Sequence, residues 1–110
     1  MAEYELADKI LIFPIKGEWF GKIDRREKSE EYREIKPYWT KRLQNAGMLD
    51  AEGKPTGKLG EAILASGYRP ENPRMWIRYV LRIGEGRPEW GAEPGKLYYI
   101  LVIVRQRRLR

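Results

Sequence analysis

Residues 75–83, "MWIRYVLRI", constrain the fold most, because their side chains divide into two faces with the period of a β-strand. One face carries Met75, Ile77, Tyr79, Leu81 and Ile83, and the other carries Trp76, Arg78, Val80 and Arg82. Residues 97–104, "LYYILVIV", form an uninterrupted apolar run, which is typical of a strand that is covered on both sides. These two segments predict a sheet, and the Gly- and Pro-rich residues 84–96 between them predict a long loop.

Three more segments are candidate strands. Residues 9–15, "KILIFPI", are typical of a short buried strand, with Pro14 near its end, where a missing backbone donor is tolerated. Residues 28–34, "KSEEYRE", are too polar for a central strand but fit a strand with one wet face. Residues 59–66, "LGEAILAS", leave helix and strand open, because Ala and Leu favour a helix while small residues bound a strand-length segment.

Two short helices are predicted between the strands. Residues 16–24, "KGEWFGKID", place Trp19 and Ile23 on one helical face. Residues 37–46, "PYWTKRLQNA", begin with a proline, which suits the first helical position, and are followed by Gly47, which suits a helix end.

The whole chain, residues 1–110, is expected to be one domain with one core. The predicted fold class is α+β and mostly β, a small barrel of about five to six strands with one or two short helices. A barrel is expected because closing a small sheet on itself removes its exposed edges.

The sequence contains no Cys and no His. These absences exclude disulfides, a thiolate nucleophile, Cys/His zinc sites and catalysis by imidazole. Neither a metal nor a cofactor is expected. No apolar run reaches the roughly 18–20 residues needed to span a bilayer, and the first residues, "MAEYELADKI", lack the pattern of a secretory signal. We therefore expect no membrane partner and a cytoplasmic location.

The net charge of +6 favours a polyanionic partner. Four arginines stand close together at the C-terminus: Arg105, Arg107, Arg108 and Arg110. Without these four arginines the net charge is only +2. Residues 105–110 are therefore expected to form a basic tail or a frayed strand end, which would add salt-dependent, nonspecific affinity for nucleic acid.

The stretch 26–39, "REKSEEYREIKPYW", mixes charges of both signs and then turns aromatic. Glu31 and Arg33 are two residues apart and would share one face of a strand. Lys28 stands at the start of that strand, from which its long side chain can reach either face. The three groups could form a polar patch at the mouth of a barrel, and such a patch suits a nucleobase. The alternative is a solvated strand face, whose cross-strand charge pairs contribute about 0.2–1 kcal/mol each.

Aromatic and basic residues elsewhere could complete a nucleotide site. The candidates for stacking on a base are Trp19, Tyr32, Tyr68, Trp76 and Trp90, and the candidates for phosphate are Lys16 and Arg69. For Trp19 and Trp76 the alternative, and the more common role of such residues, is that of core aromatics. Trp90 lies in a Gly- and Pro-rich loop, where it would be either a lid fixed to the body or a ligand contact. Tyr68 and Arg69 could equally belong to a simple turn.

Several segments together resemble the ASCH domain family, whose members are small β-barrels similar to the PUA RNA-binding fold. The family signature is a Gly, any residue, Lys, two residues, Glu, one residue and Arg, and this chain matches it with Lys28, Glu31 and Arg33. Arg26 stands where the family has Gly, the residue that most readily adopts positive φ. The resemblance covers about residues 9–104, in which "IKGEWF", "YREIKPYWTKRL", "SGYRP" and "IGEGRPEWGAEPGK" follow the order of a bacterial and phage branch.

The resemblance implies that residues 59–67 form a strand and that Lys28, Glu31 and Arg33 line a cleft. It favours a module that binds RNA or a modified nucleotide. The alternative is a hydrolase, either an N4-acetylcytidine amidohydrolase or a ribonuclease, with Lys28 as general base and Glu31 orienting it or protonating the leaving amine. The amidohydrolase branch has a Thr three residues after the Lys, whereas this chain has Glu31 there. A regulatory module with a protein partner is a third hypothesis.

Overall fold

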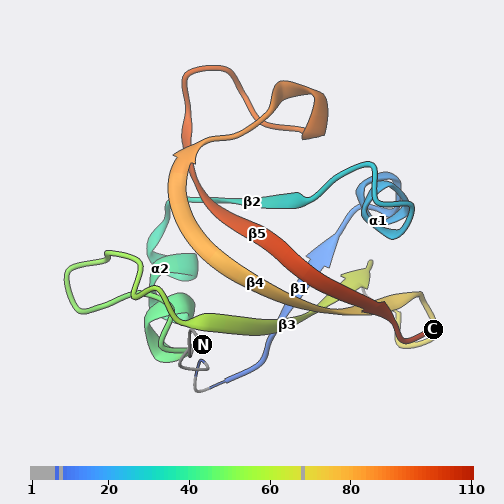
Figure 1. Cartoon of the computed structure of the whole chain (residues 1–110), viewed down its shortest axis with the longest axis horizontal. Helices are drawn as coiled ribbons and strands as arrows, with labels where there is room; N and C mark the ends of the chain where they lie inside the picture. Colours follow the sequence, from blue (N-terminus) through green and yellow to red (C-terminus); the bar gives the residue numbers. More distant parts are fainter. Residues whose placement is uncertain (1–6, 8, 68) are drawn as a thin grey trace, which may run out of the picture.

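The computed structural model describes residues 7, 9–67 and 69–110, which form a five-stranded sheet and two α-helices (Figure 1). The strands are β1 Leu11–Ile15, β2 Glu30–Glu34, β3 Leu59–Ser66, β4 Arg74–Glu85 and β5 Leu97–Arg108. The helices are α1 Gly17–Asp24 and α2 Pro37–Asn45, together with a short 3-10 helix, η1 Pro88–Trp90. The predicted class, a small α+β chain that is mostly β, is confirmed. No helix within these ranges is long and apolar enough to cross a membrane.

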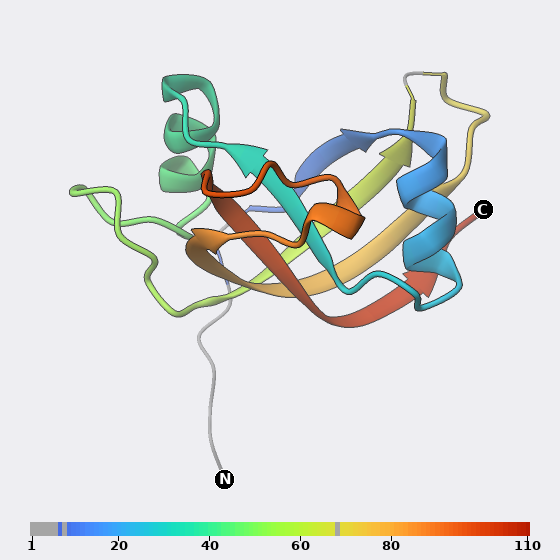
Figure 2. The ribbon, with the colours of Figure 1, turned by 90° about the horizontal axis from the view of Figure 1, so that it is seen from above.

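The sheet has the strand order β1-β3-β4-β5-β2 and curls into a half-barrel (Figure 2). β1 runs parallel to β3, and the other neighbouring strands are antiparallel. A bulge between Arg78 and Tyr79 interrupts the register of β4 with β5, and bulges of this kind bend a strand. β1 and β2 are the two edges of the sheet, so the half-barrel has one unpaired side that other groups must cover.

β3 shows that the ambiguous segment 59–66 is a strand. It pairs with β1 on one side and with β4 on the other, and Ala62 and Leu64 are fully buried. A Cβ atom at Gly60 would lie 2.6 Å from the ring of Tyr79 on the neighbouring strand. The close approach of this ring therefore requires glycine at position 60.

The main core lies between the sheet and the two helices. β4 contributes Met75, Ile77, Tyr79 and Leu81, all of them buried as the alternation predicts. Ile83, expected on the same face, is instead 39% exposed, because β4 continues past the core into its hairpin with β5. The helices add Phe20 and Ile23 from α1 and Leu43 from α2.

β5 is covered on both faces over its first half. Tyr99 and Leu101 belong to the main core. Tyr98 and Ile100 point the other way and pack with Tyr32 in a second cluster, which Ala92 of the loop 86–96 also joins. The prediction that residues 97–104 are covered on both faces holds for residues 98–101, whereas Leu97 and Val104, the first and last residues of that predicted segment, are exposed.

The basic C-terminal segment, expected to be a tail or a frayed strand end, is paired strand as far as Arg108. β5 extends through three of the four arginines, and Arg107 lies opposite Trp76 of β4. Gln106, between two of these arginines, donates a hydrogen bond of 2.8 Å to the carbonyl oxygen of Ile23. These contacts on both sides of the strand hold the segment against the sheet.

Candidate functional site

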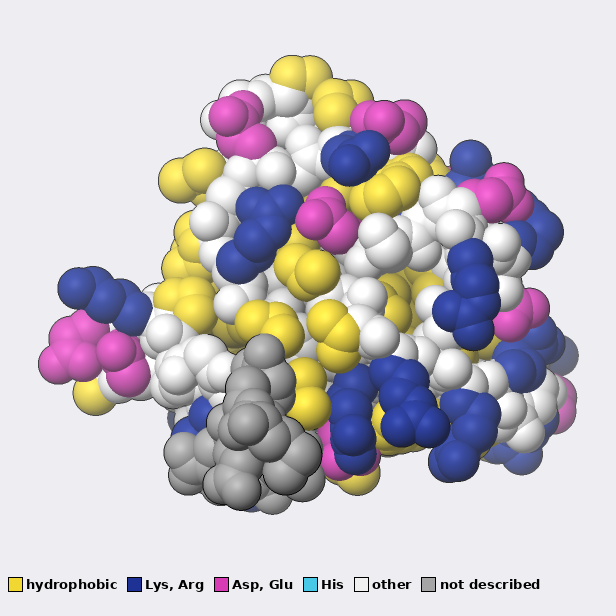
Figure 3. Space-filling view, in the orientation of Figure 1, with side chains coloured by type: hydrophobic (Ala, Val, Ile, Leu, Met, Phe, Trp, Pro, Cys, Tyr) yellow, Lys and Arg dark blue, Asp and Glu magenta, His cyan; other side chains and the backbone are white. Residues whose placement is uncertain are grey.

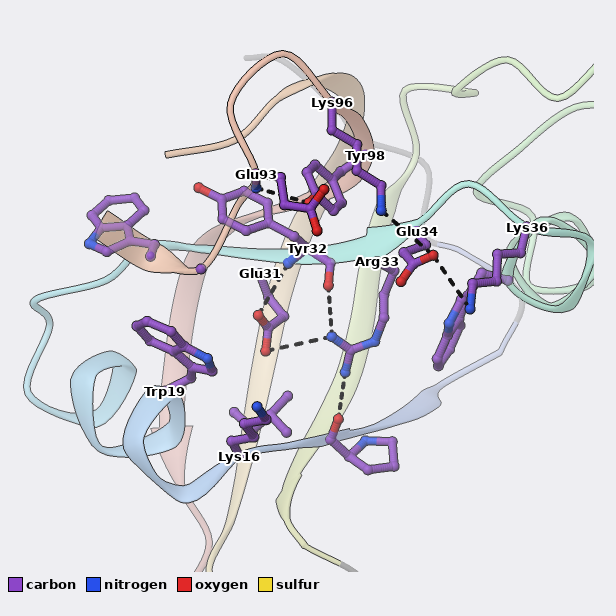
Figure 4. Close-up of a pocket in the computed structure, with 15 residues that line it drawn as sticks. Lys16, Trp19, Glu31, Tyr32, Arg33, Glu34, Lys36, Glu93, Lys96 and Tyr98 are labelled. Atoms are coloured by element: carbon purple, nitrogen blue, oxygen red, sulfur yellow. Dashed lines mark hydrogen bonds and ion pairs between the residues drawn. The ribbon is translucent and has the colours of Figure 1, made fainter. Parts of the chain in front are cut away.

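A cleft with a volume of about 410 Å³ opens at the unpaired side of the half-barrel, between β1 and β2 (Figure 4). The start of α1 and the loop 86–96 form its other walls. Six residues that the sequence singles out line this cleft: Lys16, Trp19, Glu31, Tyr32, Arg33 and Trp90. Because the Glu31 side chain is buried, the alternative of a fully solvated charged face does not describe this strand.

β2 places the carboxylate of Glu31 on the floor of the cleft. Its Oε1 accepts hydrogen bonds from Nζ of Lys28 at 2.8 Å and from the backbone N–H of Tyr32 at 3.1 Å. Nη1 of Arg33 lies 3.7 Å from Oε2, which confirms that Glu31 and Arg33 share a face. Two cations and one backbone donor therefore fix the orientation of a single carboxylate.

Arg33 fastens the two edges of the half-barrel to each other. Its Nη2 donates to the carbonyl oxygen of Pro14 on β1 at 2.6 Å, and its Nη1 donates to the carbonyl oxygen of Tyr32 at 2.8 Å. The guanidinium lies over two aromatic rings, 5.3 Å from the centroid of Phe13 and 5.2 Å from that of Trp39. Arg33 is therefore a structural residue of the cleft wall as well as a neighbour of Glu31.

Lys28 lies behind Glu31, and its ammonium group does not line the cleft. Its side chain is 0% exposed. The Nζ atom lies 4.8 Å from the ring centroid of Trp19 and 5.5 Å from that of Tyr32, so two aromatic rings and one carboxylate enclose the charge. In this arrangement Lys28 contacts Glu31 and does not reach the cleft itself.

Arg26 lies in the turn between α1 and β2, and this turn positions Lys28 beside Glu31 and Trp19. Arg26 lies two residues after Asp24, the last residue of α1, in the left-handed conformation, with φ of 63°. Its N–H bonds to the carbonyl oxygen of Ile23 at 2.9 Å, and the N–H of Glu27 bonds to that of Lys22 at 2.8 Å. This pair of bonds is a Schellman motif, in which the position of Arg26 is usually Gly. The turn therefore keeps the shape that a glycine would adopt.

The loop 86–96 is fastened to the sheet by two tyrosine hydroxyls. The backbone N–H of Arg87 donates to the hydroxyl of Tyr32 at 2.9 Å, and that of Glu93 donates to the hydroxyl of Tyr98 at 3.0 Å. Burial is the main cause that raises the pKa of Tyr32 to about 12, and a hydrogen bond from Tyr32 to Glu30 adds to it. The anchored loop carries Trp90 to the edge of the cleft.

Trp19 and Trp90 line the cleft from two different elements. Trp19 comes from α1, and its ring lies against the backbone of Gly91, where a Cβ atom would meet it at 3.0 Å. Trp90 ends η1, and the guanidinium of Arg87 lies 4.6 Å from its ring centroid. The sequence predicts that Trp90 is either a fixed lid or a ligand contact. The structure is compatible with both roles, because the anchored loop 86–96 is itself one wall of the cleft.

Charged residues that the sequence pattern does not single out lie at the rim of the cleft. Lys36 and Lys96 both lie near Oε2 of Glu34, at 3.4 Å and 3.7 Å. Trp39 adds a third indole to the lining. Lys36 and Trp39 sit within the stretch quoted for its charges and aromatics, so position in the sequence could have suggested them, whereas Lys96 is brought in only by the fold of the loop.

Two of the predicted residues, Arg69 and Trp76, lie away from this cleft. Arg69 stands in the turn between β3 and β4, where its exposed side chain lies 3.9 Å from Glu71. Trp76 lies on the opposite face of the sheet and lines a different groove. Tyr68 falls outside the described residues. Among the residues that are described, no group of three or more Asp, Glu, His or Cys is arranged to hold a metal ion.

The site thus belongs to a small α+β half-barrel with an enclosed Lys–Glu pair at the floor of an aromatic-walled cleft. Comparisons with protein-family models, with curated proteins and with solved structures find no match to this chain. Membership of the ASCH family therefore stays a prediction that rests on the sequence segments given above.

Proposed function

We propose that the cleft binds a nucleobase of RNA or of a modified nucleotide. The observation that carries this proposal is the carboxylate of Glu31, which points into the space between Trp19, Lys16 and Arg33 (Figure 4). An oriented carboxylate between indole rings provides a hydrogen-bond acceptor for the edge of a flat heterocycle and apolar surfaces for its faces.

The chemistry of Glu31 favours bases that carry an exocyclic amine. A carboxylate only accepts hydrogen bonds, so its partner in the ligand must be a donor, as in cytosine, adenine or guanine. Uracil offers a carbonyl oxygen at the place where cytosine offers an amine, so only its ring N3–H can donate to the carboxylate, beside two carbonyl oxygens that the carboxylate repels. The lysines at the rim, Lys16, Lys36 and Lys96, supply positive charge for a phosphate group outside the cleft.

The experiment is a titration of the protein with cytidine and with uridine, followed by tryptophan fluorescence. Cytidine is expected to bind more tightly than uridine, and Glu31→Gln is expected to weaken cytidine binding about 10- to 100-fold, as for a hydrogen bond to a charged group. Glu34→Gln is the matched control, because Glu34 is a half-exposed carboxylate at the rim. Equal binding of both nucleosides, or equal effects of the two variants, would contradict the proposal.

A second variant covers the case in which Glu31→Gln unfolds the protein by leaving the Lys28 charge buried without its anion. The double variant Lys28→Met/Glu31→Gln removes both charges. If Lys28 acts only through Glu31, the double variant binds cytidine as weakly as the single variant does, and circular dichroism shows a folded protein.

The hydrolase hypothesis has less support from this geometry, because the ammonium of Lys28 is enclosed and does not face the cleft. One observation keeps it as a second candidate: Lys28 and Glu31 form a buried pair at 2.8 Å beside the cleft, an arrangement that can move a proton. Its test is turnover of N4-acetylcytidine and of RNA by purified protein, with Lys28→Met as the inactive control. If the wild-type protein turns over either substrate and Lys28→Met does not, the hydrolase hypothesis would replace the binding proposal.

A further inference from the structure

A second polar groove, of about 400 Å³, lies on the outer face of the sheet. We call it the Trp76 groove and define it by the residues that line it: Glu61, Trp76, Arg78, Arg105, Gln106 and Arg107. Figure 3 shows Lys and Arg side chains gathered over the end of the sheet where β5 runs toward the C-terminus. The cleft described above lies at the unpaired edge of the half-barrel, so the two sites use different surfaces.

Three guanidinium groups gather around the indole of Trp76. Their distances from its ring centroid are 5.4 Å for Arg78, 5.5 Å for Arg107 and 6.0 Å for Arg105. Strand pairing produces this arrangement, because Arg107 lies directly opposite Trp76, and Arg105 directly opposite Arg78. Like charges opposite each other destabilise a sheet, so this cluster is a costly arrangement for the isolated protein.

Only one carboxylate in the described part of the chain balances the cluster. Glu61 accepts a hydrogen bond from Nε1 of Trp76 at 2.9 Å and lies 3.7 Å from Nη2 of Arg78. Arg105 and Arg107 are exposed and form no ion pair with any described carboxylate. Nε of Arg78 is buried and, among the described residues, has no hydrogen-bond partner. The described residues therefore supply too few carboxylates and hydrogen-bond acceptors to pair with all the guanidinium groups of the groove.

From these observations we propose that the Trp76 groove binds the phosphodiester backbone of a single-stranded nucleic acid. Arg105 and Arg107 are two residues apart on one strand face, about 7 Å along the strand, which is close to the separation of consecutive phosphates in an extended strand. Each guanidinium can hold a phosphate through two parallel N–H donors. The ring of Trp76 makes cation–π contacts with the guanidinium groups and so restricts their conformations.

Binding at the Trp76 groove is expected to be independent of base sequence, because its donors would contact the charged phosphates and not the edges of the bases. It goes beyond the proposed function, since the groove could hold a strand whether or not a base enters the cleft. RNA and single-stranded DNA share the phosphodiester chemistry, so the groove is expected to bind both, and the experiment compares one oligonucleotide of each kind.

The test is fluorescence anisotropy with labelled twelve-nucleotide oligo-uridine and oligo-thymidine at several salt concentrations. The double variant Arg105→Gln/Arg107→Gln is expected to bind both oligonucleotides at least tenfold more weakly at low salt. Loss of two phosphate contacts should also reduce the slope of log K against log salt by about 1.4. The matched control, Lys41→Gln/Lys54→Gln, removes two charges from α2 and the loop after it, and it should bind like the wild type.

Two results would overturn the proposal. One is a double variant that binds oligonucleotides no more weakly than the control variant. The other is polyglutamate that displaces oligo-uridine at equal charge concentration, because the groove would then accept any acidic partner. Cytidine, which has no phosphate, separates this proposal from the first one. The arginine variant should keep cytidine binding, and the double variant Lys28→Met/Glu31→Gln should keep the salt-dependent binding of oligonucleotides.

Discussion

Arg33 on β2 donates a hydrogen bond of 2.6 Å to the carbonyl oxygen of Pro14 on β1, although these two strands are the opposite edges of the sheet. The same guanidinium also donates to the carbonyl oxygen of Tyr32. One side chain thus closes the unpaired side of the half-barrel and forms the cleft wall beside Glu31. The position of the cleft depends on this link.

Replacing Arg33 by Lys keeps the charge but cannot reach both carbonyl oxygens with a planar group. We expect Arg33→Lys to lower the free energy of unfolding by about 1–3 kcal/mol, the range for lost hydrogen bonds of a charged group. Urea unfolding measures the change. The control is Arg42→Lys on the exposed face of α2. Equal stability of the two variants would show that the link to Pro14 contributes nothing.

Replacing Arg26 by Gly should stabilise the protein. Arg26 has φ of 63°, a conformation that glycine adopts without steric cost and other residues adopt at a cost of roughly 1 kcal/mol. We expect Arg26→Gly to raise the midpoint of thermal unfolding. Arg26→Ala serves as the comparison, because alanine removes the side chain but keeps the strain. A midpoint that rises equally in both variants would mean that the side chain, and not the backbone, is responsible.

Stability should fall at alkaline pH, in part because of Tyr32. Folding raises the pKa of its hydroxyl from 10.0 to about 12, with Glu30 and Arg87 as its charged neighbours. The protonated hydroxyl therefore stabilises the fold fully below pH 10, and this contribution is lost as the pH rises toward 12. Tyr32→Phe lacks the titrating group. The difference in unfolding free energy between wild type and Tyr32→Phe should thus shrink between pH 8 and pH 11.5, whereas parallel curves would contradict this account.

Replacing Gly86 by Ala should disturb the anchored loop. A Cβ atom at Gly86 would lie 2.7 Å from both the ring of Tyr32 and the Cβ of Ala92, so the loop would have to move away from the sheet. We expect a loss of about 1–3 kcal/mol in unfolding free energy, together with increased fluorescence quenching of Trp90 by iodide. Gly17→Ala is the control, since its Cβ would meet Ser66 at an ordinary 3.6 Å. The account fails if the two variants behave alike.

The strands that carry the sheet could be predicted because their patterns are local. The period-two arrangement of residues 75–83 and the apolar run 97–104 follow from side chains that alternate or are covered on both faces. The shared face of Glu31 and Arg33 follows in the same way, from two residues on one strand. Gly60 is different, because its need for glycine depends on a tyrosine ring from another strand.

The features of the fold and of the site that could not be predicted from the sequence depend on contacts between segments that are distant in the chain. The direction of Lys28 is set by the rings of Trp19 and Tyr32, and an isolated strand start leaves that direction open. The arginines of residues 105–108 look like a tail in composition, yet pairing with β4 makes them strand. Tyr68, expected to stack on a base, lies outside the described residues, and its role stays a prediction.

The central claim is that Glu31 accepts a hydrogen bond from a base held in the cleft, and two-dimensional NMR tests it most directly. The backbone N–H of Tyr32 donates to the same carboxylate, so its signal reports on Glu31. The account predicts that cytidine shifts this signal and the indole signals of Trp19 and Trp90, and that uridine shifts them much less. Saturating cytidine that leaves all three signals in place would contradict it.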